Sequence, residues 1–179
     1  MKKINSGEII SAAIFAALII IGTFIKIPTS VVPVTLQTFF VLLTGYMLNK
    51  RASVFAVLIY ILLGLAGLPV FAAGGGVAYI FKPTFGYVLG FLVCVFVMNS
   101  INQMTFKFSD VLSGILGMAA IYIVGIFYFI LVSRMIINIS YGIGDIILIC
   151  LLPVLPIDIL SVICAKLLSD RIKKAVSSR

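Results

Sequence analysis

The chain has 179 residues, of which 63% are hydrophobic and 10% are charged, and its formal net charge is +8. A soluble domain carries about a quarter charged residues, so this composition excludes an ordinary soluble protein. Four stretches contain no Lys, Arg, Asp or Glu, and each is long enough to cross the apolar core of a bilayer: 27–49, 52–81, 83–106 and 111–133. The chain is therefore predicted to be an integral membrane protein.

The apolar stretches and the charges between them predict an all-α membrane protein with six transmembrane helices and structured outer loops. We expect one domain over residues 1–179, with spans near 8–25, 36–48, 53–68, 84–98, 111–133 and 157–168. An even number of spans leaves both termini on the same side of the membrane.

The positive charges indicate the orientation. Ten of the 13 Lys and Arg residues fall near the termini or in alternate connections, at positions 2, 3, 50, 51, 107, 166, 171, 173, 174 and 179, and the other three are Lys26, Lys82 and Arg134. Loops that stay in the cytoplasm are enriched in Lys and Arg, so both termini are predicted to be cytoplasmic in a multi-pass plasma-membrane protein. This distribution explains the basic charge without a nucleic-acid partner.

The first predicted span contains two pairs of alanines four residues apart, Ala12 with Ala16 and Ala13 with Ala17. Small residues at this spacing let helix backbones approach closely in lipid. The pairs are explained either by packing within this chain or by a face that docks another membrane subunit.

Two connections on the predicted outer side are irregular. Residues 27–38 read IPTSVVPVTLQT, with prolines at 28 and 33, and the second connection contains Gly74, Gly75 and Gly76. Irregular backbone at membrane depth is tolerated where protein covers it or where it lines a cavity. We therefore expect the two loops to cover a pocket at the outer surface.

Polar residues in and beside these loops are candidates for ligand contacts. Lys82 is either an interfacial lysine that extends its ammonium group to water or a cation that holds a substrate carboxylate. Neutral hydrogen bonds are expected from Thr35, Gln37, Tyr79, Thr84 and Tyr87.

Asp158 is an acid well inside an apolar run, two residues after Pro156. Proline favours the first turn of a helix, where a carboxylate stabilises the positive end of the helix dipole, so a capping role is one explanation. The other is a ligand contact, which we favour because an intramembrane carboxylate costs about 2.5–3.5 kcal/mol at a helix centre and usually faces a cavity or a partner.

Residues that would support enzymatic chemistry are missing from the sequence. It contains no His, no Gly-Lys pair of a phosphate-binding loop and no Cys-x-x-Cys pair. The three cysteines, Cys94, Cys150 and Cys164, lie in apolar surroundings and are expected to behave as small hydrophobic side chains. The chain is predicted not to be an enzyme and to need no cofactor, and any ATP energy must come from another component.

Three segments form a distinctive set: PVTLQTFFVLLTGYMLNKR at 33–51, LLGLAGLPVFAAGGGVAYIFKPTFGYVLGF at 62–91 and LPIDIL at 155–160. Together they resemble the BioY family, the biotin-specific S components of energy-coupling-factor (ECF) transporters. The resemblance implies a six-helix protein with an outward-facing vitamin pocket, in which Asp158 contacts the ligand ring and Lys82 and the glycine loop cover its tail. It also implies partners, namely a membrane coupling subunit docked on the alanine face and two cytoplasmic ATPases.

One position departs from the family pattern. BioY relatives often have P-x-D-x-x-K in the last span, and here Ser161 replaces the lysine, so Ser161 is expected to be a weaker polar contact. Biotin is the expected ligand. Lipoate or dethiobiotin is the alternative within this class, and a membrane scaffold without a small-molecule ligand is the alternative outside it.

Overall fold

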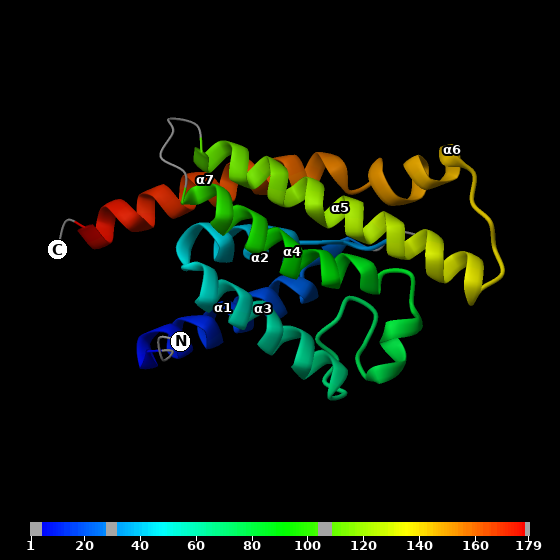
Figure 1. Cartoon of the computed structure of the whole chain (residues 1–179), viewed down its shortest axis with the longest axis horizontal. Helices are drawn as coiled ribbons and strands as arrows, with labels where there is room; N and C mark the ends of the chain where they lie inside the picture. The colour runs from blue at the N-terminus through cyan, green and yellow to red at the C-terminus, as the bar shows by residue number, and fades with distance from the viewer. Residues whose placement is uncertain (1–4, 28–31, 104–108, 178–179) are drawn as a thin grey trace.

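The computed structural model describes residues 5–27, 32–103 and 109–177, and these form an elongated helical bundle with one small hairpin (Figure 1). The helices are α1 Ser6–Phe24, α2 Gln37–Met47, α3 Lys50–Leu65, α4 Phe85–Asn102, α5 Ser109–Met135, α6 Ile143–Ile146 and α7 Leu155–Ser177. The shorter elements are β1 Lys26–Ile27, β2 Val34–Thr35, the 3-10 helix η1 Val77–Phe81 and the π-helix η2 Ile147–Leu151. The prediction of an all-helical fold is confirmed.

Polar side chains cap the N-termini of α1 and α3 and form a hydrogen bond between these two helix ends. The Glu8 carboxylate accepts a hydrogen bond from the Asn5 backbone N–H at 3.1 Å, and the Asn49 side-chain oxygen accepts from the backbone N–H groups of Arg51 and Ala52. The side-chain amide of Asn49 also donates to Glu8 at 2.7 Å. Two helix N-termini are thus capped and tied together at one end of the bundle.

Helices α4 and α5 lie side by side because small residues allow their backbones to approach (Figure 1). A Cβ added to Gly90 of α4 would lie 2.9 Å from the Cα of Ile121 on α5, and one added to Gly125 would lie 2.7 Å from the Tyr87 ring. Lipid tails are as apolar as the side chains of a helix, so helices gain little by burying apolar surface against each other in a membrane. Close backbone packing of this kind holds them together instead.

The number of membrane-spanning helices is not confirmed as six. Among the described residues, α1, α4 and α5 are each long and apolar enough to span a membrane. A fourth span is possible if Ile143–Leu151, which comprises α6 and η2, crosses together with α7, to which it is bent by 43°. Helix α2 has 11 residues, about 16 Å of helix, which is half the thickness of a typical bilayer core of about 30 Å. Helix α7 extends beyond the predicted 157–168, and the α6–η2 segment before it was not predicted.

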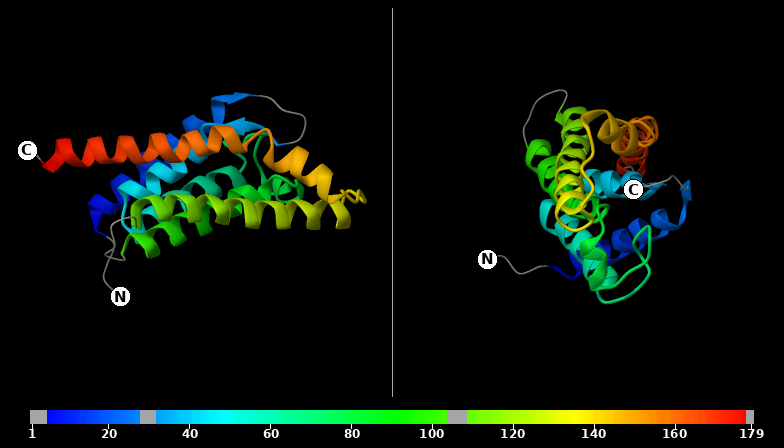
Figure 2. Two further views of the ribbon diagram at one scale, coloured as in Figure 1. Left: turned by 90° about the horizontal axis from the view of Figure 1, so that it is seen from above. Right: turned by 90° about the vertical axis from the view of Figure 1, so that its right-hand side faces the viewer.

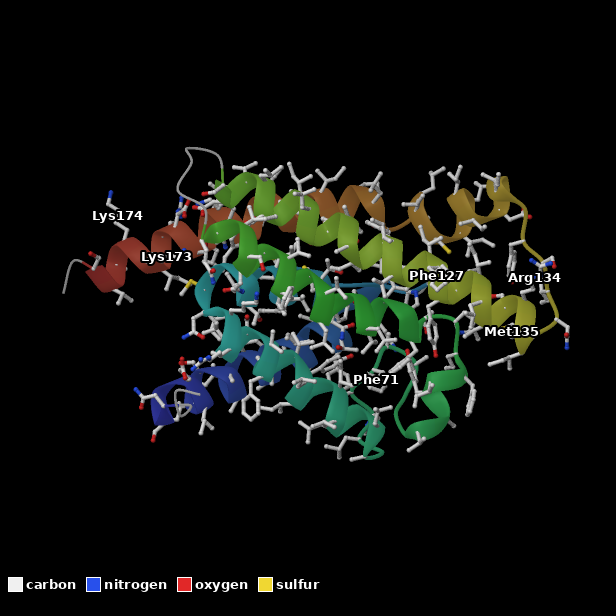
Figure 3. All side chains as sticks on the ribbon, viewed as in Figure 1. Phe71, Phe127, Arg134, Met135, Lys173 and Lys174 are labelled. Carbon is white, nitrogen blue, oxygen red and sulfur yellow. The ribbon has the colours of Figure 1, made fainter. Side chains whose placement is uncertain are left out.

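The two predicted outer connections lie at the same end of the bundle. The strands β1 and β2 form an antiparallel hairpin, and the loop between α3 and α4 folds back so that Phe71 and Gly74 pair (Figure 2). Arg134 lies toward this end, whereas Lys173 and Lys174 project at the other end, where α1 begins (Figure 3). Pro28 and the charges at 2, 3, 107 and 179 lie outside the described residues.

Candidate functional site

A small cavity of about 50 Å³, open to the surface, lies among α2, α4, α5, α7 and the two loops. Its apolar wall comes from Val88, Phe91, Ile121 and Val154, together with Val32 and Pro33 of the first loop and Ala72 of the second. Its polar wall consists of Thr35, Gln37, Thr38, Tyr79, Thr84, Tyr87 and Asp158. An apolar cavity with a few convergent polar groups is the usual form of a small-molecule site.

Asp158 lies in the first turn of α7 and is only 3% exposed. Its Oδ2 accepts a hydrogen bond from the Tyr122 hydroxyl of α5 at 2.7 Å, whereas its Oδ1 is buried without a hydrogen-bond partner among the described residues. The carboxylate thus faces α5 and the cavity, which favours the ligand-contact explanation over a helix cap. Oδ1 is the acceptor that Asp158 offers the cavity, and the Thr38 side chain of the same wall lies beside the carboxylate.

Gln37 begins α2 on another wall of the same cavity and is 4% exposed. Its side-chain Nε2 is buried without a hydrogen-bond partner in the part of the chain that the structure describes. A buried polar group without a partner costs about 1–3 kcal/mol, so a free donor and a free acceptor in one cavity are unusual. Together they match a ligand that both accepts and donates hydrogen bonds.

Aromatic rings build the part of the site below the second loop. Phe71 and Tyr79 have ring centroids 4.6 Å apart, and the Tyr79 hydroxyl lies 3.3 Å from Thr84 Oγ1. Burial raises the pKa of the Tyr79 hydroxyl, so this group remains neutral and protonated at physiological pH. Tyr79 and Thr84 can therefore supply neutral hydrogen bonds only.

The glycine loop and Lys82 lie beside the cavity but do not line it. Gly74 and Gly76 adopt φ values of 114° and 95°, which only glycine adopts without strain, and they allow the tight loop that carries Ala72 to the cavity. The Lys82 ammonium group donates to the carbonyl oxygen of Ala73 at 2.8 Å. Direct ligand contacts from Gly74, Gly75 and Gly76, as predicted, find no support in this arrangement.

Ser161 is also absent from the cavity wall. It is buried one helical turn beyond Asp158, and its hydroxyl donates to the carbonyl oxygen of Ile157 in the same helix at 2.9 Å. Because the hydroxyl already has a hydrogen-bond partner in its own helix, it does not require a ligand as a partner. The predicted ligand contact of Ser161 is therefore not supported.

The alanine pairs of α1 occupy different environments. Ala12 and Ala16 are 0% and 2% exposed, because they pack against the chain's own helices, whereas Ala13 and Ala17 are exposed. Packing within this chain therefore accounts for Ala12 and Ala16. A docking role for the exposed Ala13 and Ala17 stays a prediction.

Sequence reasoning did not identify three residues that belong to the surroundings of the site. Thr38 lines the cavity one position after Gln37, and its place in the VTLQT segment was the available signal. Tyr122 and Lys26 gave no such signal, because Tyr122 lies within a long apolar helix and Lys26 resembles an interfacial lysine. No group of three or more His, Cys, Asp or Glu side chains within the described ranges could hold a metal ion.

The model of the BioY family matches residues 1–178. A probable biotin transporter BioY of Lysinibacillus sphaericus is 35% identical, with 99% of this chain and 92% of that protein covered. The biotin transporter BioY of Thermotoga maritima is 38% identical over 93% of this chain and 96% of its own length.

One solved structure has a closely similar fold. It is the crystal structure of the S-component for biotin from an ECF-type ABC transporter, with a TM-score of 0.77, 22% sequence identity, and coverage of 97% of this chain and 95% of that chain. At this identity the likeness concerns the fold.

Proposed function

The chain belongs to the BioY family, and we propose that it is the S component of an ECF transporter and binds biotin for uptake across the plasma membrane. Its relatives are named as transporters rather than enzymes, which agrees with the absence of catalytic residues from the sequence. The biotin named for these relatives and for the similar structure supports the choice of ligand.

The observation that carries the proposal is the pair of unpartnered buried atoms in the cavity, Oδ1 of Asp158 and Nε2 of Gln37. The cyclic urea of biotin has two N–H donors and one carbonyl acceptor. An N–H of the urea would donate to Asp158, and the urea carbonyl would accept from Gln37. Each contact removes the cost of a buried group without a partner, and the bond to the carboxylate is charge-assisted.

The same two atoms discriminate between the alternative ligands. Lipoate carries a disulfide ring without an N–H or carbonyl group, so it would leave both atoms without partners. Dethiobiotin keeps the urea and would satisfy them. A scaffold without a ligand gives no reason to retain an unpartnered carboxylate oxygen in a buried cavity.

Titration of the detergent-purified protein with biotin, dethiobiotin and lipoate tests this proposal. We expect one-to-one binding of biotin, weaker binding of dethiobiotin, which lacks the second ring, and no heat with lipoate. Binding of lipoate without biotin would assign a different cargo to the same transporter family. Binding of none of the three would contradict the proposed site.

We further propose six spans, with α2 and α3 as the two short ones, and cytoplasmic termini. Lys50 and Arg51 begin α3, and the later part of α7 carries Lys166, Arg171, Lys173 and Lys174. The beginning of α3 and the end of α7 lie toward the end of the bundle where α1 begins (Figure 1). The other three described basic residues lie toward the cavity. Lys26 and Lys82 belong to the two loops, and Arg134 lies at the end of α5. The positive-inside rule then assigns the cavity to the outside. Labelling of Arg134→Cys and Lys174→Cys variants in intact cells tests this orientation. We expect an impermeant thiol reagent to label the cysteine at position 134 and not the one at position 174.

The partners proposed are a membrane coupling subunit and two cytoplasmic ATPases, with the exposed alanines of α1 as the docking face. Ala13→Leu is expected to reduce copurification of the coupling subunit several-fold and to leave biotin binding unchanged, because the added bulk separates two helices that need close approach. The measurement is recovery of the coexpressed complex.

Ala12→Leu is the matched variant one position away. Because Ala12 is fully buried, the larger side chain is expected to destabilise the S component itself by about 1–3 kcal/mol. Equal recovery of the complex with Ala13→Leu and with the wild type would contradict the docking face.

A further inference from the structure

Two lysines from different loops bind consecutive carbonyl groups of the glycine loop. The Lys26 ammonium group donates to the carbonyl oxygen of Ala72 at 3.0 Å, and the Lys82 ammonium group donates to that of Ala73 at 2.8 Å. The two lysines are distant in sequence, and both side chains are exposed. Their two positive charges therefore converge on two consecutive peptide groups.

These two peptide groups lie at the edge of the cavity. Ala72 lines the cavity, and the Lys82 nitrogen lies 5.1 Å from the ring centroid of Tyr79, which also lines it. On the other side, the β1–β2 register pairs Lys26 with Thr35, another residue of the cavity wall. The hairpin and the loop therefore hold both ammonium groups beside the mouth of the cavity.

Neither charge is neutralised by an acid of the chain. All five acidic residues lie in the described ranges, and the salt bridges formed there join Lys166 to Asp110 and Asp170. Within the described residues, Lys26 and Lys82 donate to the neutral carbonyl groups of Ala72 and Ala73. A carboxylate is a stronger acceptor for an ammonium group than a neutral carbonyl, because its full negative charge adds Coulomb attraction to the hydrogen bond.

We propose that Lys26 and Lys82 jointly select ligands that end in a carboxylate. The proposal rests on the proposed function: with the urea held by Asp158 and Gln37, the carboxylate of the aliphatic tail would lie at the mouth. There it would accept a hydrogen bond from each lysine, one on each oxygen, in exchange for the carbonyls of Ala72 and Ala73. Lys26 is then a specificity-determining residue that acts together with Lys82.

Comparison of biotin with its uncharged carboxamide separates this role from a structural one. The two compounds share the ring and the chain and differ only at the terminal group. We expect the wild-type protein to bind biotin at least about 10-fold more tightly than the carboxamide, as hydrogen bonds to charged groups imply. In the Lys26→Met/Lys82→Met double variant the ratio is expected to approach 1, through weaker binding of biotin alone, with each single variant in between.

Arg134→Met is the control, because it removes an exposed cation from α5 outside the cavity wall. It should leave the ratio unchanged. If the lysines only hold the loop, the double variant will bind both compounds more weakly and keep the wild-type ratio, which would overturn the proposal. An unchanged affinity for both compounds would also overturn it. Failure of the wild-type protein to bind either compound would instead overturn the proposed function, and this proposal with it.

Discussion

Asp158→Asn is expected to weaken biotin binding roughly 10- to 100-fold, which corresponds to the loss of a charge-assisted hydrogen bond of about 1.5–3 kcal/mol. The carboxylate has one oxygen bound by Tyr122 and the other free toward the cavity. An amide of the same shape is a neutral acceptor and offers an N–H group where the ligand also has one. The measurement is the dissociation constant of biotin by calorimetry.

The same variant is expected not to destabilise the protein without ligand. A buried ionised carboxylate carries an unfavourable desolvation cost, and the neutral amide reduces it. Unchanged or higher thermal stability together with weaker binding would therefore assign Asp158 to function rather than to folding.

Two further variants complete this test. Tyr122→Phe removes the hydroxyl that orients the carboxylate and should weaken binding by a smaller factor than Asp158→Asn. Asp170→Asn changes the same charge further along α7, on a half-exposed side chain paired with Lys166, and should leave binding unchanged. Wild-type affinity in Asp158→Asn would show that the urea is bound elsewhere.

Gly75→Ala is expected to lower both the stability of the protein and its affinity for biotin. A Cβ at this position would lie 2.0 Å from the carbonyl oxygen of Leu68, 2.7 Å from its carbonyl carbon and 3.1 Å from the carbonyl oxygen of Gly64. Because these atoms all belong to the backbone, no side-chain rotation relieves the clash, and the loop that carries Ala72 must move. Overpacking of this kind costs about 1–3 kcal/mol.

Thermal unfolding in detergent, with and without biotin, measures both effects. Gly144→Ala is the control, since a Cβ there meets nothing within 4 Å, and it should change stability by no more than about 0.5 kcal/mol. A Gly75→Ala protein with wild-type unfolding temperature and affinity would mean that the loop does not depend on this close approach.

Composition and motifs are enough to identify the class of the protein and most of its polar cavity wall. Long uncharged stretches identify a membrane protein because charges are costly in lipid, and the motif segments identify the family, which is confirmed. Thr35, Gln37, Tyr79, Thr84, Tyr87 and Asp158 were all named from the sequence and all line one cavity. Polar residues are rare in so apolar a chain and are costly in lipid. They can therefore be recognised as candidates for a binding site before the structure is known.

The hydrogen-bond partners of these groups could not be predicted before the fold was known. Tyr122 reaches Asp158 across 36 positions, and Lys26 reaches Ala72 across 46, and no local pattern encodes such pairs. The faces of α1 were equally ambiguous, because Ala12 and Ala13 are separated by one helical step of about 100°, and only packing shows which one is buried. Local sequence specifies which residues need a partner, whereas the partner is chosen by contacts between distant segments when the chain folds.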